Sequence, residues 1–120
     1  HRVKSKDNPD KRVEILQEYV RNNFKNQKYL NYALSIEKET LKKKNNLILN
    51  VDGTIGATLL DIFENSNFTQ EEIEEILSGD ILNGFFLLSR TIGFIGHYND
   101  QNRLKQGLFR FDTNDIAYLK

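Results

Sequence analysis

The stretch from Ile81 to about Lys105 constrains the fold most strongly, because its apolar residues recur at helical spacing over a greater length than anywhere else in the chain. Its first half is apolar on nearly every side and contains Ile81, Leu82, Phe85, Phe86, Leu87, Leu88, Ile92, Phe94 and Ile95. A helix that lacks a polar face is typically buried. Glycine inside a helix is unfavourable unless backbones pack closely there, and this stretch contains Gly84, Gly93 and Gly96. The sequence therefore predicts a long, buried helix.

Four shorter helices are predicted ahead of it. Asn8 is typical of an N-cap and Pro9 of a first helical position, so one helix should run from there to about Asn22. Further helices are expected at about 29–41, 52–65 and 69–78, the last beginning at a capping box formed by Thr69 and Glu72. No segment alternates apolar and polar residues over a useful length. We therefore expect an all-α domain.

Composition excludes several classes of function. The 17 basic and 17 acidic side chains cancel, so we expect no binding of nucleic acid or of a membrane through an overall field. The chain has no cysteine and only two histidines, which leaves no thiolate metal site and too few histidines for a histidine-based one. No apolar run approaches the length of a membrane span, about 18 residues. We expect a soluble intracellular domain and, because the sequence opens at His1 without an initiator Met, a fragment of a longer protein.

The stretch Leu47–Gly56 joins a short apolar run to a new helix through Asp52 and Gly53. A carboxylate at a helix N-terminus is stabilised by the unpaired N–H groups there. Asp52 is therefore either an N-cap or an acid or base that faces a cleft, and this stretch alone leaves both open. The same residues partly match an EF-hand loop, but Ile48 and Leu59 would occupy positions that need oxygen ligands. We expect no calcium site.

Several cations have both a structural and a ligand-binding interpretation. The run Lys42–Lys44 follows the second predicted helix and either complements the helix dipole or holds phosphates near Asp52. Arg90 lies within the apolar helix, and because a guanidinium keeps its charge it must meet an anion there, either a protein carboxylate or a carboxylate ligand. Arg110 lies between two phenylalanines and is by default a surface arginine.

Four segments, in order, resemble the signature segments of the citrate synthase superfamily: His-Arg-Val at 1–3, Asn-Pro-Asp-x-Arg at 8–12, Asn-Val-Asp-Gly at 50–53 and Arg-Thr-Ile-Gly at 90–93. The stretch Gly-Phe-Ile-Gly-His-Tyr-Asn-Asp-Gln-Asn-Arg-Leu-Lys-Gln-Gly-Leu-Phe-Arg at 93–110 is similar to the C-terminal citryl-CoA lyase region of ATP-citrate lyases. The resemblance covers nearly all 120 residues. It implies that residues 1–120 form the C-terminal portion of a multi-helical citrate synthase-like domain.

The resemblance implies catalytic and substrate-binding roles for individual residues. His1 would act on the citrate hydroxyl or the oxaloacetate carbonyl, and Asp52 would exchange a proton with the methyl carbon of acetyl-CoA. The carboxylates of citrate or oxaloacetate would be bound by Arg12, Arg90 and Arg110. The last of these would reach into the site of a neighbouring subunit.

The resemblance also implies the ligands and partners. Coenzyme A, as a substrate, would be bound at Lys43 and Lys44, with help from Arg2 or Lys4. ATP and Mg²⁺ would act only in modules outside this chain. The expected partners are citrate or oxaloacetate, CoA thioesters and further copies of the chain in a dimer-based cytoplasmic tetramer. We expect the fragment alone to be inactive, because a second catalytic histidine would lie upstream of His1.

Three functions are compatible with these observations. The first is a lyase module that splits citryl-CoA to acetyl-CoA and oxaloacetate as the last step of ATP-driven citrate cleavage. The second is a citrate or methylcitrate synthase that uses the same residues for condensation. The third is a non-catalytic helical module that dimerises through its glycine-bearing helix. The ending Gly-His-Tyr-Asn-Asp-Gln at 96–101 favours the first over the second.

Overall fold

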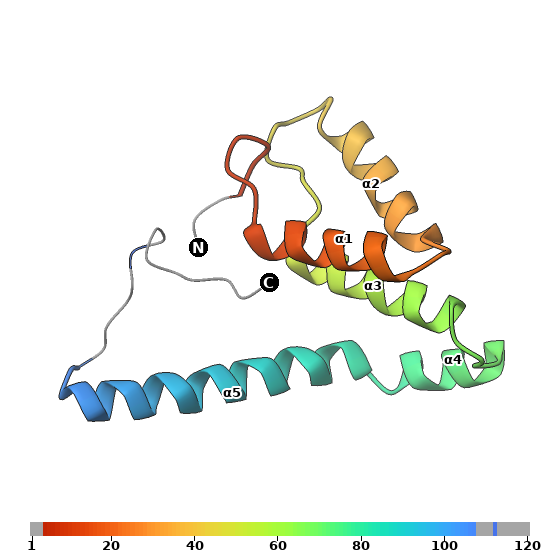
Figure 1. Ribbon diagram of the computed structural model, residues 1–120. Coiled ribbons are helices and arrows are strands. Elements are labelled where there is room, and N and C mark those ends of the chain that lie inside the picture. Colours follow the sequence, from red (N-terminus) through yellow and green to blue (C-terminus); the bar gives the residue numbers. More distant parts are fainter. Residues whose placement is uncertain (1–3, 108–111, 113–120) are drawn as a thin grey trace. The chain divides into compact units, whose positions relative to one another are not determined.

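The computed structural model describes residues 4–107 and 112. Over these residues the chain forms five α-helices and no β-strand (Figure 1): α1 (Lys11–Asn23), α2 (Lys28–Thr40), α3 (Val51–Glu64), α4 (Gln70–Ser78) and α5 (Ile81–Leu104). The predicted all-α class is confirmed. The described chain divides into two compact units between Ile73 and Glu74, within α4, and each unit is described by itself.

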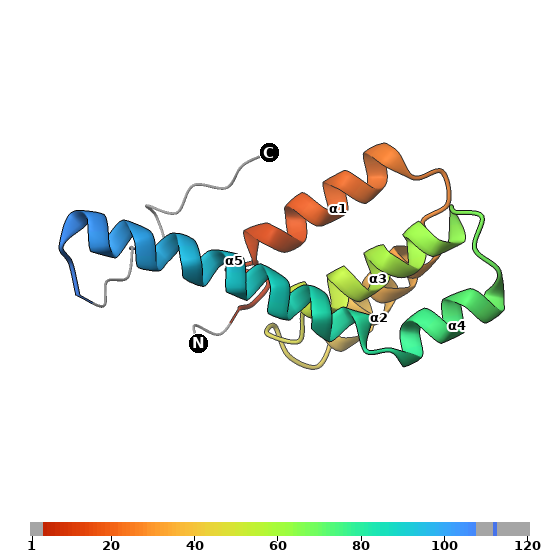
Figure 2. The ribbon, with the colours of Figure 1, turned by 90° about the horizontal axis from the view of Figure 1, so that it is seen from below.

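The core of the first unit is built around α3, which packs against both α1 and α2 (Figure 2). Its buried residues include a set at spacings of three and four, which places them on one face of the helix: Thr54, Ala57, Thr58 and Asp61. The apolar core contains Val13, Val20, Leu30, Ala57 and Phe63. Complete burial of a side chain such as Leu30 contributes about 1.5–3 kcal/mol relative to leaving it exposed.

The N-cap of α1 is Asp10, so the prediction that Asn8 caps this helix is wrong. Asn8 instead forms a backbone bridge with Ser5, in which each residue's N–H donates to the other's carbonyl oxygen at 3.0 and 3.2 Å. Asp10 accepts a hydrogen bond from the backbone N–H of Arg12 at 3.0 Å. The helix therefore begins two residues later than expected, because an aspartate just beyond Pro9 is also a strong cap.

The N-cap of α3 decides one of the two interpretations left open for Asp52. Asn50, rather than Asp52, is the N-cap, and its side-chain oxygen accepts from the backbone N–H of Gly53 at 2.8 Å. The hydroxyl of Thr54 donates to the carbonyl oxygen of Asn50, also at 2.8 Å. Asp52 is the second residue of the helix, so the N-cap interpretation of this carboxylate is wrong.

The bounds of the last two helices agree with the prediction. The capping box that begins α4 is present: the backbone N–H of Thr69 donates to the Glu72 carboxylate at 2.7 Å, and the Glu72 N–H donates to the Thr69 hydroxyl at 3.3 Å.

Across the described part of the chain, no helix combines the length and the apolar content needed to cross a membrane.

The expected burial of α5 is not found within this chain. None of its residues is buried, and its exposed apolar side chains include Leu82, Phe85, Leu87, Leu88, Ile92, Phe94 and Ile95. A methyl group added at Gly84, Gly93 or Gly96 would meet open space. Apolar periodicity predicts that a helix face is buried, but it does not identify the chain or segment that packs against that face.

Candidate functional site

Asp52 lies in the first turn of α3 and is exposed. Since Asn50 performs the capping, the Asp52 carboxylate is not needed to satisfy the helix terminus. Within residues 4–107 and 112 it makes no hydrogen bond or ion pair. An exposed carboxylate that has no internal partner is available to a ligand.

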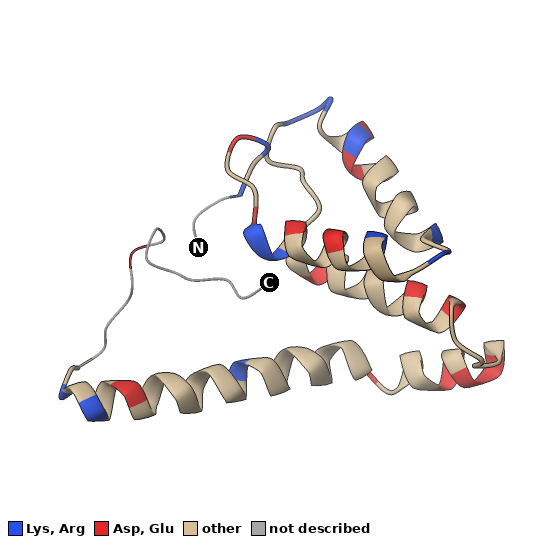
Figure 3. Cartoon of the chain, viewed as in Figure 1, with Lys and Arg blue, Asp and Glu red and all other residues tan. Residues whose placement is uncertain are grey.

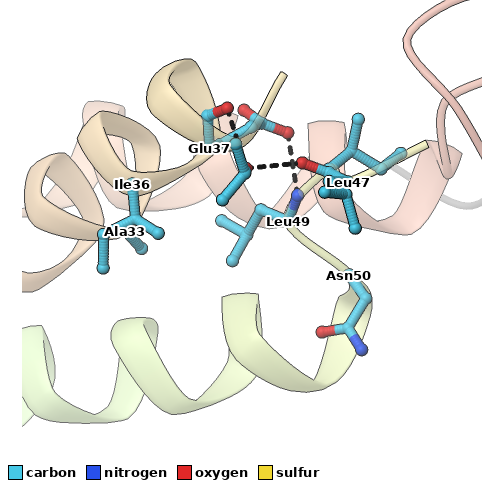
Figure 4. A pocket seen from close by; sticks show the side chains of 8 residues that line it. Ala33, Ile36, Glu37, Leu47, Leu49 and Asn50 are labelled. Carbon is cyan, nitrogen blue, oxygen red and sulfur yellow. Dashed lines mark hydrogen bonds between the residues drawn. The ribbon is translucent and has the colours of Figure 1, made fainter. Parts of the chain in front are cut away.

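The strap that leads into α3, residues 47–50, is attached to α2 by two side chains (Figure 4). The backbone N–H of Leu49 donates to the Glu37 carboxylate at 2.8 Å. The hydroxyl of Thr40 lies 2.7 Å from the carbonyl oxygen of Leu47 and 3.0 Å from that of Glu37, so it donates to this pair of acceptors. The strap and α2 together line an open pocket of about 320 Å³. Its lining residues are Ala33, Ile36, Glu37, Thr40, Leu47, Ile48, Leu49 and Asn50.

The lysine run lies in the turn between α2 and this strap (Figure 3). Lys42 is paired with the carboxylate of Glu39 at 2.7 Å, which fits the structural interpretation of that residue. Lys43 and Lys44 are exposed and make no ion pair in the described part of the chain. Their backbone N–H groups both donate to the carbonyl oxygen of Thr40, at 2.9 and 3.2 Å, which closes the end of α2.

Arg12 is engaged by the carboxylate of Asp10. Its Nε and one terminal nitrogen donate to the two carboxylate oxygens at 3.0 and 2.7 Å, a fork that fixes the plane of the guanidinium. The hydrogen bond from Arg12 holds the pKa of Asp10 below its ordinary value and outweighs the opposing effect of burial. The Arg12 side chain is still 56% exposed. Nearby, the ammonium group of Lys4 donates to the carbonyl oxygen of Pro9 at 3.4 Å.

Arg90 is exposed on α5, so the expectation that it is buried is wrong for this chain. Its guanidinium lies over the ring of Phe86, 4.7 Å from the ring centroid. Within the described residues it has no carboxylate partner. An exposed guanidinium keeps its hydration and therefore needs no internal counter-ion. Arg90 belongs to the second unit, whereas Arg12, Lys43, Lys44 and Asp52 belong to the first.

Three predicted site residues, His1, Arg2 and Arg110, lie outside the described residues. In the described part of the chain no cluster of histidine, cysteine, aspartate or glutamate has the arrangement of a metal site. Sequence reasoning missed the contribution of Glu37. The available signal was its position in the apolar stripe of the second helix, at helical spacing from Leu30, Ala33 and Leu41.

Comparison with known proteins shows what this helical segment is similar to. No family model matches the chain. It is 54% identical over 121 residues to ATP-citrate synthase beta chain protein 2 of Arabidopsis thaliana, and 55% identical over 120 residues to human ATP-citrate synthase. These alignments include 100% and 99% of this chain but 20% and 11% of the relatives. The chain therefore spans a fifth or less of the length of these relatives.

The chain is also similar to solved structures of ATP citrate lyases. The chain superposes on ATP citrate lyase of Methanothrix soehngenii, in complex with citrate and coenzyme A, with a TM-score of 0.78 and 50% identity over 100% of this chain and 20% of that one. A mutant of the Methanosaeta concilii enzyme in complex with (3S)-citryl-CoA matches with a TM-score of 0.79 and 49% identity, over the same shares of the two chains. The expected citrate synthase-like fold is confirmed. Over its whole length, the chain is homologous to a segment of ATP-citrate lyases.

Proposed function

We propose that this chain forms part of the module of an ATP-citrate lyase that cleaves citryl-CoA. The observation that carries the proposal is the whole-length similarity to enzymes whose structures hold citrate, coenzyme A and citryl-CoA. The exposed Asp52 carboxylate, which is not used as a helix cap, supports it. In the complete protein, citrate, coenzyme A and ATP would give acetyl-CoA, oxaloacetate, ADP and phosphate.

Cleavage of citryl-CoA is a retro-aldol reaction. His1 is the proposed base that removes the proton of the citryl hydroxyl, because an imidazole titrates near neutral pH. The electron pair of that O–H bond forms the carbonyl of oxaloacetate, and the adjacent C–C bond breaks. Its electrons pass to the enolate of acetyl-CoA, and Asp52 protonates the terminal carbon to give the methyl group.

The cations bind the two ends of the substrate. Arg12, Arg90 and Arg110 are the proposed partners of the citryl carboxylates, because guanidinium groups bind carboxylates in a fork and fix the bond to be broken. In the first unit, Lys43 and Lys44 are exposed and make no ion pair among the described residues, as expected of lysines that bind the phosphates of coenzyme A. Arg2 and Lys4 would assist them.

The proposed assembly is a dimer-based tetramer in the cytoplasm, with residues 1–120 forming one part of the lyase domain and Arg110 completing the site of a neighbouring copy. The exposed apolar side chains of α5 support the assembly, because such surfaces are normally covered in a stable protein. The open space at Gly93 and Gly96 would let another helix approach closely.

The test is the change Asp52→Asn in the full-length protein, with citryl-CoA supplied directly. Loss of the proton donor is expected to slow the appearance of acetyl-CoA by about 10²–10⁴-fold. The matched control is Glu71→Gln, which neutralises an exposed acid at the same position, the second residue, of α4. Turnover of Asp52→Asn within a few-fold of the unmodified protein would favour a non-catalytic module. If the full-length protein condensed acetyl-CoA with oxaloacetate but did not cleave citrate in the presence of ATP, a citrate synthase would be favoured.

A further inference from the structure

Glu37 is a half-buried acid whose charge is not matched by a cation. Within the described residues it forms no ion pair. Its carboxylate accepts a hydrogen bond from the backbone N–H of Leu49 at 2.8 Å. Its side chain points from α2 toward the strap, beside the pocket (Figure 4). A carboxylate that accepts a backbone N–H forms a charge-assisted bond, which is stronger and more directional than a neutral one.

The residue that Glu37 holds is joined directly to the start of α3. Leu49 directly precedes Asn50, the N-cap of α3, and Asp52 is the second residue of that helix. A Cβ placed on Gly53 would lie 2.9 Å from a terminal carbon of Leu49, so the strap lies closely against the first turn of the helix. A displacement of Leu49 would therefore move the cap and, with it, the Asp52 carboxylate.

The same attachment sets the distance between Asp52 and the lysine turn. Thr40, one helical turn after Glu37, binds both the strap through Leu47 and the backbone of Lys43 through its carbonyl oxygen. All of these residues lie in the first unit. A substrate held at its phosphate end by the lysines would meet Asp52 at its reacting carbon only if this spacing is kept.

We propose that Glu37 is a positioning residue, which fixes the strap and thereby places Asp52 at the reacting carbon of the thioester. The proposal rests on the function proposed above. It differs from a purely structural role in a defined way: a structural residue changes how much protein is folded, whereas a positioning residue changes the chemical rate of the folded enzyme. Small misplacements of a catalytic group are sufficient to lower such rates strongly.

The test uses three variants of the full-length protein and measures kcat and KM for added citryl-CoA, each normalised to the folded fraction. Glu37→Gln keeps an oxygen that can accept the Leu49 N–H, so its kcat should stay within about threefold of normal. Glu37→Asp withdraws the carboxylate by one methylene and Glu37→Met removes it, and both should lower kcat by about tenfold or more while KM changes by less than about threefold. Glu39→Met is the control, since Glu39 is exposed on the same helix and pairs with Lys42.

A normal kcat for folded Glu37→Asp would overturn the proposal, and this variant decides the matter if Glu37→Met does not fold. Combination with Asp52→Asn gives a second criterion: a residue that acts through Asp52 should cause no further loss once Asp52 is neutralised. Additive losses would contradict positioning. If Asp52→Asn is slow and Glu37→Asp is normal, the proposed function stands and only the positioning role fails. If Asp52→Asn itself is normal, the proposed function fails.

Discussion

The carboxylate of Asp61, on α3, accepts a hydrogen bond from the backbone N–H of Leu30, in the first turn of α2, at 3.0 Å. Its other oxygen accepts from the N–H of Tyr29 at 2.9 Å. The N-cap of α2, Gln27, makes no side-chain capping bond, so Asp61 performs this task from a neighbouring helix. Asp61 and Leu30 are both fully buried. One side chain therefore satisfies a helix terminus and joins two helices of the core.

Replacement of Asp61 by Ala should destabilise the first unit, because it leaves the buried N–H of Leu30 and the part-buried N–H of Tyr29 without acceptors. The expected loss is about 2–4 kcal/mol, from the cost of unsatisfied buried donors. Hydrogen exchange of the α2 amides in the full-length protein would report this loss locally. Glu64→Gln, at the exposed end of the same helix, breaks only an exposed ion pair of 3.6 Å with Lys28 and should change exchange much less. Equal protection of α2 in the two variants would contradict the role of Asp61.

Asp10→Asn should lower the stability of α1 in a way that depends on pH. The hydrogen bond from Arg12 holds the pKa of Asp10 below its ordinary value of 3.8. Because the folded carboxyl binds its proton less readily than the unfolded one, the charged form stabilises the fold fully above pH 3.8, and this contribution is lost as the pH falls through the folded pKa. Asparagine still caps the helix, so the difference at neutral pH should be about 0.5–1 kcal/mol.

The measurement is amide exchange in α1, corrected for intrinsic rates, in the full-length protein and its Asp10→Asn variant over a range from about pH 3 to 7. The difference between the two should decrease toward the acid end. Asp7→Asn removes an exposed carboxylate from the same segment and serves as the control. A difference that grows toward low pH would have the wrong sign for a carboxyl whose pKa is lowered.

Gly53→Ala and Gly56→Ala place the same methyl group one turn apart on α3. We expect the first to displace the strap and the second to stabilise the helix. At Gly53 the new Cβ would lie 2.9 Å from a terminal carbon of Leu49 and 3.2 Å from the capping oxygen of Asn50, so the strap must shift. At Gly56 nothing lies within 4 Å. Gly56→Ala should therefore stabilise the helix by up to about 1 kcal/mol through its better helix propensity. Gly53→Ala should lower the rate of citryl-CoA cleavage, and a normal rate would show that the strap tolerates displacement.

The helix bounds were predictable from sequence because periodicity and capping residues are local signals. α4 begins at the expected pair, Thr69 and Glu72, and α5 ends within a residue of the expected position. The cap of α1 was misplaced because two good capping residues lie within two positions of each other, and propensity alone does not choose between them. The local sequence left Asp52 as either a cap or a cleft-facing acid, and the resemblance implied its catalytic role. Only the structure shows that Asp52 does not cap α3.

Other features depend on contacts between distant segments, which periodicity does not specify. Asp61 acts on residues 31 and 32 positions away, and Glu37 on a residue 12 positions away. Arg90 was expected to be buried because its neighbours are apolar, but the sequence does not state what covers them. The proposed meeting of Asp52 and Arg90 at one ligand stays a prediction, since these residues belong to different units.

The exposed face of α5 leads to a last prediction, on assembly. Phe94 is 73% exposed, more than the other large apolar side chains of this helix, and it lies between Gly93 and the following Ile95. A charge placed there should cost little in an isolated helix but should weaken an interface that buries it. Phe94→Glu is therefore expected to shift the full-length protein from oligomer toward smaller species in sedimentation velocity, with its helical content unchanged. Asn99→Glu adds the same charge to a polar, exposed position of α5 and should leave the oligomer intact. An unmodified protein that sediments as a monomer would contradict the proposed assembly.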